Sequence, residues 1–173
     1  MGFTTEENFQ AVRHGKTALR HFDSADGIPF PFTASLFTKE QIDGLKEENL
    51  TRFESLAYHS IMSAITSHPE IISERTVLVL SSTKGNVGVL QDTENDKNII
   101  NLGEAARKIS DKIGLSQSPI VVSNACISGV SAIILATRLI DADKTDNVIV
   151  CGVDEQSPFI ISGFESLKAL SES

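Results

Sequence analysis

Three short apolar runs constrain the fold of this chain most, because each is long enough for a buried strand and too short for a buried helix. They cover about residues 76–81, 119–123 and 147–153. Stretches with apolar residues at helical spacing separate them, over 51–68, 103–113 and from Cys126 to about Ile140. Continuous apolar strands that alternate with helices are typical of a parallel sheet covered by helices on both faces. The pattern therefore predicts an α/β layered sheet.

Local signals add detail to this architecture. Thr4 and Glu7 have the spacing of a capping box, which predicts an N-terminal helix. The prolines within residues 27–37 predict an extended surface segment there, not a central strand. The helix from Cys126 to about Ile140 is apolar on nearly every side, so we expect it to be central and buried. Gly129 would let this helix pack closely on a neighbour.

Cys126 stands where the strand 119–123 gives way to that apolar helix, and small residues surround it. A thiol at the N-terminal end of a helix meets the positive end of the helix dipole, which favours the nucleophilic thiolate. Nearby backbone N–H groups can stabilise an oxyanion, and nucleophiles on other folds use the same strand–turn–helix junction. The alternative is a buried structural cysteine, since free cysteines are among the most buried residues.

Composition narrows the classes of partner and compartment. The chain has 173 residues, enough for one domain over 1–173, and a net charge of −8. This charge argues against nucleic acid and against an anionic membrane surface as partners. The sequence shows neither an apolar run long enough to span a membrane nor a signal peptide. Its two cysteines suggest no disulfide framework and fit a reducing cytoplasm, and Cys151 lies inside an apolar run as a buried strand residue would.

Two other kinds of site find little support in the sequence. The segment Ser81–Gly88 is rich in serine and glycine, but Lys84 precedes its glycine, so the segment is not a phosphate-binding P-loop. The four histidines have no metal-ligand spacing with another histidine, a cysteine or a carboxylate. We therefore expect neither a metal nor an organic cofactor.

Three stretches acquire meaning from their order and spacing. They are Val77–Gly88, the Ala125-Cys126-x-Ser128-Gly129 element, and the Gly163-Phe164-x-Ser166-Leu167 element. Together they resemble the N-terminal half of a β-ketoacyl-[acyl-carrier-protein] synthase of the elongating type, a condensing enzyme with a thiolase-like fold. The resemblance covers essentially the whole chain. It implies a three-layer half-domain with a mixed, mostly parallel sheet between helices, truncated at both ends and lacking the family's first and last strands of this half.

The resemblance also implies an activity and a set of site residues. Cys126 would accept an acyl group as a thioester, and the parent enzyme would extend it by decarboxylative Claisen condensation in fatty acid or polyketide-type synthesis. Ala125 and Ile127 would shape the acyl entry, and Phe164 would line the acyl site. Lys84 would lie near the acyl pocket, where a lysine would shorten an apolar channel or point to solvent. The carrier protein and acyl and malonyl thioesters would be the partners.

The resemblance also leads to expectations about assembly. Strand 119–123 would be an edge strand that pairs with its two-fold mate in a homodimer. The family's first strand lies in the middle of its sheet, so we expect unpaired edges inside apolar surroundings here. The family's catalytic histidines, its lysine and its Gly-Phe-Gly loop have no counterpart in this sequence, so we expect the chain alone to be inactive in condensation. Two alternatives stay open: a non-catalytic module that associates with itself or with a complementary chain, and a thiolase or initiating-type synthase on the same fold.

Overall fold

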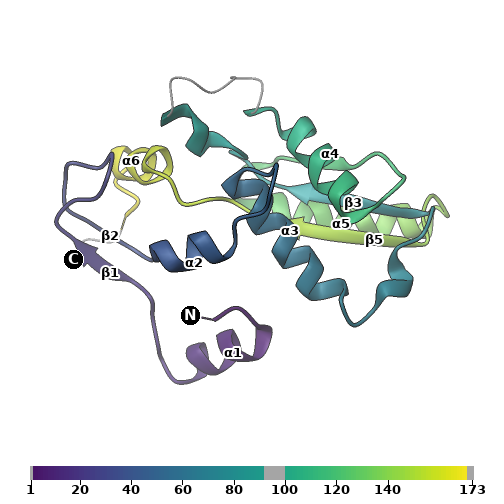
Figure 1. The fold of residues 1–173 in the computed structure, drawn as a ribbon, viewed down its shortest axis with the longest axis horizontal. Helices are drawn as coiled ribbons and strands as arrows, with labels where there is room; N and C mark the ends of the chain where they lie inside the picture. The colour runs from purple at the N-terminus through teal and green to yellow at the C-terminus, as the bar shows by residue number, and fades with distance from the viewer. Residues whose placement is uncertain (1, 92–99, 171–173) are drawn as a thin grey trace. The chain divides into compact units, whose positions relative to one another are not determined.

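The computed structural model describes residues 2–91 and 100–170 and divides the chain into two compact units. One unit is formed by Met1–Lys39 together with Gln156–Ser173, and the other by Glu40–Glu155. The larger unit contains a three-stranded sheet, and the smaller contains a two-stranded one (Figure 1).

The sheet of the larger unit consists of the three strands expected from the apolar runs. They are β3 (Thr76–Ser81), β4 (Ile120–Val122) and β5 (Asn147–Gly152), in the order β4-β3-β5. Both pairings are parallel, with Val79 opposite Ile120 in β4 and opposite Val150 in β5. All six residues of β3 are buried, as the central position of the strand requires. The prediction of a parallel α/β sheet is confirmed.

Helices cover both faces of this sheet (Figure 1). The alternation of β3 side chains decides which residues meet which helices. Leu78 and Leu80 belong to the cluster with α3 (Arg52–Ile65) and α4 (Leu102–Ile113), whereas Val77 and Val79 pack with α5 (Ser128–Asp141). The result is three layers, with α3 and α4 on one face and α5 on the other.

The helix ends follow local sequence signals. Thr51 and Glu54 form a capping box at the start of α3, and Asn101 caps α4. Gly114 ends α4 with a φ of 90°, in the left-handed region that favours glycine. The predicted helix 51–68 is shorter in the structure and ends at Ile65.

The expected gap inside the sheet is not found among the described strands. β3 pairs with β5 over its full length, from Thr76 opposite Asn147 to Ser81 opposite Gly152. Unpaired backbone groups in apolar surroundings cost free energy. The pairing of β3 with β5, each six residues long, bonds the backbone groups that face each other between the two strands. The prediction of unpaired edges inside the sheet was therefore wrong. Within the described part, the free edges are the outer sides of β4 and β5.

Helix α5 is not the buried central helix that its apolar sequence predicts. Its buried residues are the small residues Ser128, Ala132 and Ala136. The larger apolar residues on its other face are exposed: Val130, Ile133, Ile134 and Ile140. The cause is that α5 packs on one side only. Among the described residues, the core cluster that includes α5 joins it to the strands of the sheet. The exposed residues form what we call the outer face of α5.

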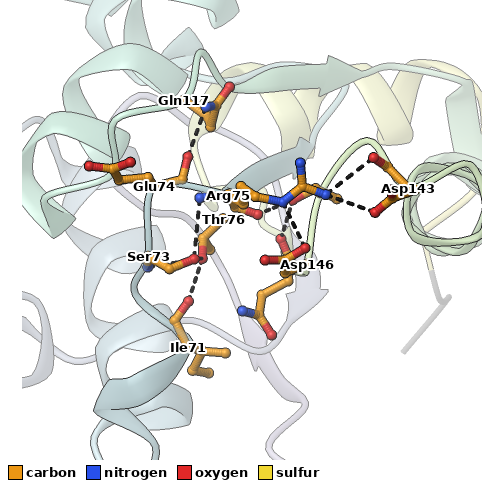
Figure 2. A network of polar contacts seen from close by, with 10 residues as sticks. Ile71, Ser73, Glu74, Arg75, Thr76, Gln117, Asp143 and Asp146 are labelled. Carbon is orange, nitrogen blue, oxygen red and sulfur yellow. Dashed lines mark hydrogen bonds and ion pairs between the residues drawn. The ribbon is translucent and has the colours of Figure 1, made fainter.

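A polar network fixes the amino-terminal ends of β3 and β5, and Figure 2 shows it. The Arg75 guanidinium donates from Nε to Asp146 Oδ1 at 2.8 Å and from Nη2 to Asp143 Oδ1 at 2.9 Å. The hydrogen bond to Asp146, followed by its charge, raises the pKa of Arg75. The Asp146 N–H in turn donates to the Arg75 carbonyl at 3.0 Å. This network ties the 143–147 loop to the start of β3, at the edge of the sheet opposite the candidate site.

The smaller unit has a small hydrophobic core of its own. It contains α1 (Thr5–Arg13), an antiparallel pair of strands, β1 (Arg20–Phe22) and β2 (Phe32–Ala34), and α6 (Pro158–Ser166). Its core holds Ile28, Phe32 and Ile161. The capping box of α1 is confirmed, with Thr4 and Glu7 bonding each other's backbone N–H groups. Residues 27–37 are partly extended as expected, but Ile28 and Phe32 are buried because they supply this core.

The short helix α2 is Lys39–Gly44, of which Lys39 belongs to the smaller unit and the other residues to the larger one. No helix in residues 2–91 and 100–170 is both long and apolar enough to cross a membrane.

Candidate active site

The carboxyl-terminal ends of the parallel strands gather loops at one edge of the sheet, the place where ligands bind in open α/β folds. Backbone bonds hold the first loop residues together there. The Ser82 N–H donates to the Val122 carbonyl at 3.3 Å, and the Val153 N–H donates to the Ser81 carbonyl at 3.1 Å. The segment that carries Cys126 leaves β4 at this edge.

Cys126 lies in a tight turn between strand and helix. The turn Ala125–Ile127 is a 3₁₀ helix, and α5 begins only at Ser128. Cys126 therefore precedes α5, and the expectation that it begins the helix is corrected by two residues. Ala125, the first residue of the turn, has a φ of 43°, an uncommon conformation for a residue other than glycine.

The hydroxyl of Ser128 bonds the turn to the first turn of the helix. It donates to the Ala125 carbonyl at 2.8 Å and accepts from the Asn124 N–H at 2.8 Å. The Asn124 side chain adds a bond from Nδ2 to Ser131 Oγ at 3.1 Å. None of these bonds of Ser128, Asn124 and Ser131 was predicted from the sequence. Small polar residues on both sides of a cysteine at such a junction were the available signal.

The two thiols are in opposite environments. Cys126 is exposed, and Cys151 is buried in β5 as predicted. Burial raises the pKa of the Cys151 thiol to about 11, so this group stays protonated and unreactive near neutral pH. The exposure of Cys126 excludes its alternative interpretation as a buried structural cysteine in this chain.

The turn places two of the other predicted site residues next to the thiol. Ala125 and Ile127 flank it, and Ile127 has 57 % of its surface exposed. Lys84 lies in the loop after β3, two residues after the Ser82 whose N–H bonds the end of β4, and its expected position near the acyl pocket stays a prediction. It is half-buried, and its Nζ donates to Thr83 Oγ1 at 2.6 Å.

Gly129 does not have its predicted role. A Cβ added there meets no atom within 4 Å, so no neighbour packs closely against it among the described residues. The reason is again the outer face of α5, on which Gly129 is exposed.

Two buried carboxylates that were not predicted from the sequence stabilise the loop that contains Lys84. Glu155 Oε1 accepts the Gly88 N–H at 2.6 Å, and Glu54 Oε1 accepts from Asn86 Nδ2 at 3.0 Å. Burial raises the pKa of Glu155, while the Gly88 N–H and the charge of Arg52 oppose the shift. Glu155 comes just after a strand, but this position does not indicate its contact with Gly88, and Glu54 lies within α3 with no such signal. In residues 2–91 and 100–170, no group of three or more histidine, cysteine or acidic side chains could hold a metal ion.

Comparison with known proteins identifies the family of the chain. The family described as β-ketoacyl synthase, N-terminal domain, matches residues 43–173. The chain belongs to the β-ketoacyl synthase family. The match includes the Cys126 turn, the Lys84 loop and α6, and membership supports a module of a condensing enzyme. No curated protein matches the chain.

A solved structure supports the same fold. It is described as a ketosynthase (ApeO) in complex with its chain length factor (ApeC) from Xenorhabdus doucetiae. Our chain is similar to one of its chains with a TM-score of 0.66 and 25 % identity, over 95 % of our chain. The match covers 46 % of that chain, so our sequence spans about half the length of this ketosynthase relative. The predicted thiolase-like half-domain is confirmed.

The last predicted site residue of this β-ketoacyl synthase domain, Phe164, is on α6 in the smaller unit. Its side chain is 43 % exposed. Its N-terminal neighbours are held by Ser157, which caps α6 by accepting the Ile160 N–H at 3.4 Å. The expected position of Phe164 beside the thiol stays a prediction.

Proposed function

We propose that this chain supplies the acyl-accepting part of a β-ketoacyl-[acyl-carrier-protein] synthase of the elongating type. Cys126 Sγ attacks the carbonyl carbon of an acyl thioester, the thiol of the carrier leaves with the proton, and an acyl-cysteine results. A malonyl thioester would then lose CO₂ and attack that acyl carbon, in fatty acid or polyketide-type synthesis. The chemistry requires no metal or organic cofactor.

The observation that carries this proposal is the exposed thiol in a turn between strand and helix at the carboxyl edge of the sheet, in a chain of the ketosynthase family. The turn supports one further assignment. The Ile127 N–H is bonded to the Asn124 carbonyl at 3.1 Å, and the Ser128 N–H is bonded to the Ala125 carbonyl. We therefore assign the Cys126 N–H as a donor to the oxyanion that forms during acyl transfer.

Incubation with an acyl thioester, followed by intact mass and peptide mapping, tests the proposal. We expect the mass of one acyl group on the peptide that contains Cys126, because the exposed thiol can form a thioester. The C126A variant should not gain this mass, whereas C151A, which removes the buried thiol, should react as the wild type does. A wild-type chain that stays unmodified, or an acylated C126A variant, would contradict the proposal.

We also propose a homodimer through β4, with a carrier protein as the second partner and the cytoplasm as the compartment. The position of β4 at the end of the order β4-β3-β5 supports edge pairing. The free state of both cysteines fits a reducing compartment.

The outer face of α5 favours the second candidate function, a non-catalytic module that associates with itself or with a complementary chain. Val130, Ile133 and Ile134 expose between 45 % and 60 % of their surfaces on one helix. Contiguous apolar surface of this kind marks interaction sites in soluble proteins. A chain that associates but is not acylated at Cys126 would favour this function over the first.

A further inference from the structure

The conformation of Ala125 is unusual enough to need support from its surroundings. Its φ of 43° lies in the left-handed region, which costs a residue with a Cβ free energy that glycine does not lose. Such a residue keeps its conformation only where neighbouring groups fix it. Ala125 directly precedes the nucleophile, so its conformation decides where the Cys126 side chain points.

One hydroxyl bonds the backbone on both sides of Ala125. Ser128 Oγ accepts from the Asn124 N–H, on the N-terminal side, and donates to the Ala125 carbonyl, on the C-terminal side, each at 2.8 Å. A hydroxyl can do this because it carries one donor and two acceptor sites. Ser128 is 6 % exposed, so its hydroxyl is held inside the protein, whereas Asn124 and Ala125, whose backbone groups it bonds, are exposed.

We propose that Ser128 is a positioning residue for the nucleophile: its hydroxyl holds Ala125 in the left-handed conformation and thereby presents the Cys126 thiol at the carboxyl edge of the sheet. The inference rests on the proposed function in that Cys126 is the nucleophile. The hydroxyl does not touch the substrate, and its effect passes through the backbone of the turn.

The rate of Cys126 alkylation by iodoacetamide, followed by peptide mapping, measures this effect without any acyl substrate. We expect S128A to slow alkylation by about fivefold. Without the hydroxyl, most molecules should relax Ala125 out of the left-handed conformation, and only the remaining fraction should present the thiol as the wild type does. The matched control is T137A, because Thr137 Oγ1 also donates to a backbone carbonyl of α5, that of Ile133 at 3.1 Å, but lies away from the turn. T137A should leave the rate unchanged.

The double variant A125G/S128A separates positioning from simple packing. Glycine adopts a φ near 43° without support, so the double variant should recover most of the wild-type rate. Loss of packing at Ser128 alone would not be repaired by a change at residue 125. Circular dichroism and thermal melting of each variant show whether it folds, and if S128A does not fold, the double variant should fold and react.

An S128A variant that folds and reacts at the wild-type rate would overturn the proposal, and so would a double variant that stays slow or unfolded. These outcomes differ from failure of the proposed function. If the proposed function failed, acyl thioesters would leave the wild-type Cys126 unmodified, while the alkylation rates of the variants would still report on the conformation of the turn.

Discussion

The reactivities of Cys126 and Cys151 can be compared within one molecule, since the larger unit contains one exposed and one buried thiol. Burial raises the pKa of Cys151 to about 11, which leaves little thiolate near neutral pH. We expect iodoacetamide to label Cys126 well before Cys151 at pH 7.5, as measured by peptide mapping over time. Preferential labelling of Cys151 would show that the exposed turn is not the reactive position, and labelling in denaturant provides the control in which both thiols react.

Glu155 should make the stability of the chain depend on pH. Its pKa in the folded chain is raised from 4.5 by burial, so the folded state keeps a proton that the unfolded state releases first. Stability therefore falls as the pH rises from about 4.5 through the raised pKa. Melting curves at closely spaced pH values should show this fall, and it should be smaller in E155Q, in which the amide oxygen can still accept the Gly88 N–H.

The measurement must separate Glu155 from surface carboxylates. Glu7 and Glu70 have lowered pKa values, Glu7 chiefly through a hydrogen bond from the Phe3 backbone N–H and Glu70 chiefly through one from its own. Their effect on stability therefore lies below pH 4.5, where stability rises with pH, opposite in sign to the effect of Glu155. A fall in stability above 4.5 that is identical in wild type and E155Q would exclude Glu155 as its source.

Gly88 and Gly129 should respond in opposite ways to the same substitution. A Cβ at Gly88 would clash with Glu155 Oε1, so G88A must displace the buried carboxylate and should cost about 1–3 kcal/mol of stability. A Cβ at Gly129 meets nothing within 4 Å, and alanine is the better helix former, so G129A should add up to about 1 kcal/mol. Chemical denaturation measures both, and a destabilised G129A would mean that the outer face of α5 is covered in solution.

The edge strand β4 carries the prediction about self-association. The Val122 carbonyl accepts from the N–H of Ser82, the residue just after β3. Alternate residues of a strand direct their backbone groups to opposite sides, so the N–H and C=O of Val121 face the free edge. V121P removes that outward N–H without removing a bond to β3, and we expect it to convert a dimer into a monomer in sedimentation velocity. Val121 also packs against the core cluster below α3 and α4, so V121K should weaken the fold as well as the dimer.

The control for this prediction is the melting temperature of each variant. A V121P chain that melts like the wild type and sediments as a monomer would support pairing through β4. A wild-type chain that is monomeric at micromolar concentration would contradict the proposed homodimer.

The whole chain should accept an acyl group but not complete a condensation. Its histidines do not form an acid–base pair in the described structure. Instead, His59 Nε2 lies 3.3 Å from Glu47 Oε1, and His68 Nδ1 lies 3.1 Å from Glu70 Oε1. His59 is on α3, which covers the face of the sheet opposite to α5. Incubation with acyl and malonyl thioesters should therefore yield acyl-Cys126 and no β-ketoacyl product by mass spectrometry. A β-ketoacyl product that disappears in C126A would overturn this expectation.

Local patterns predicted much of the fold because they report local physics. The apolar runs gave the positions of β3, β4 and β5, and the capping box of Thr4 and Glu7 gave the start of α1, since a cap needs only its own few neighbours. The junction at Cys126 could be predicted for the same reason: a strand, a turn of small residues and a helix follow one another directly in the chain.

Tertiary structure decided what depends on residues far apart in the sequence. The apolar sequence of α5 predicts burial, but burial depends on what packs against the helix, and its outer face is exposed. The sequence implied a gap in the sheet, whereas β3 and β5 pair directly across 71 positions, from Thr76 to Asn147. The carboxylate of Glu155 reaches Gly88, 67 positions away, and no local pattern can indicate such a contact. Strands, caps and the cysteine turn are set by neighbours in the chain, while layers, exposure and buried charge are set by neighbours in space.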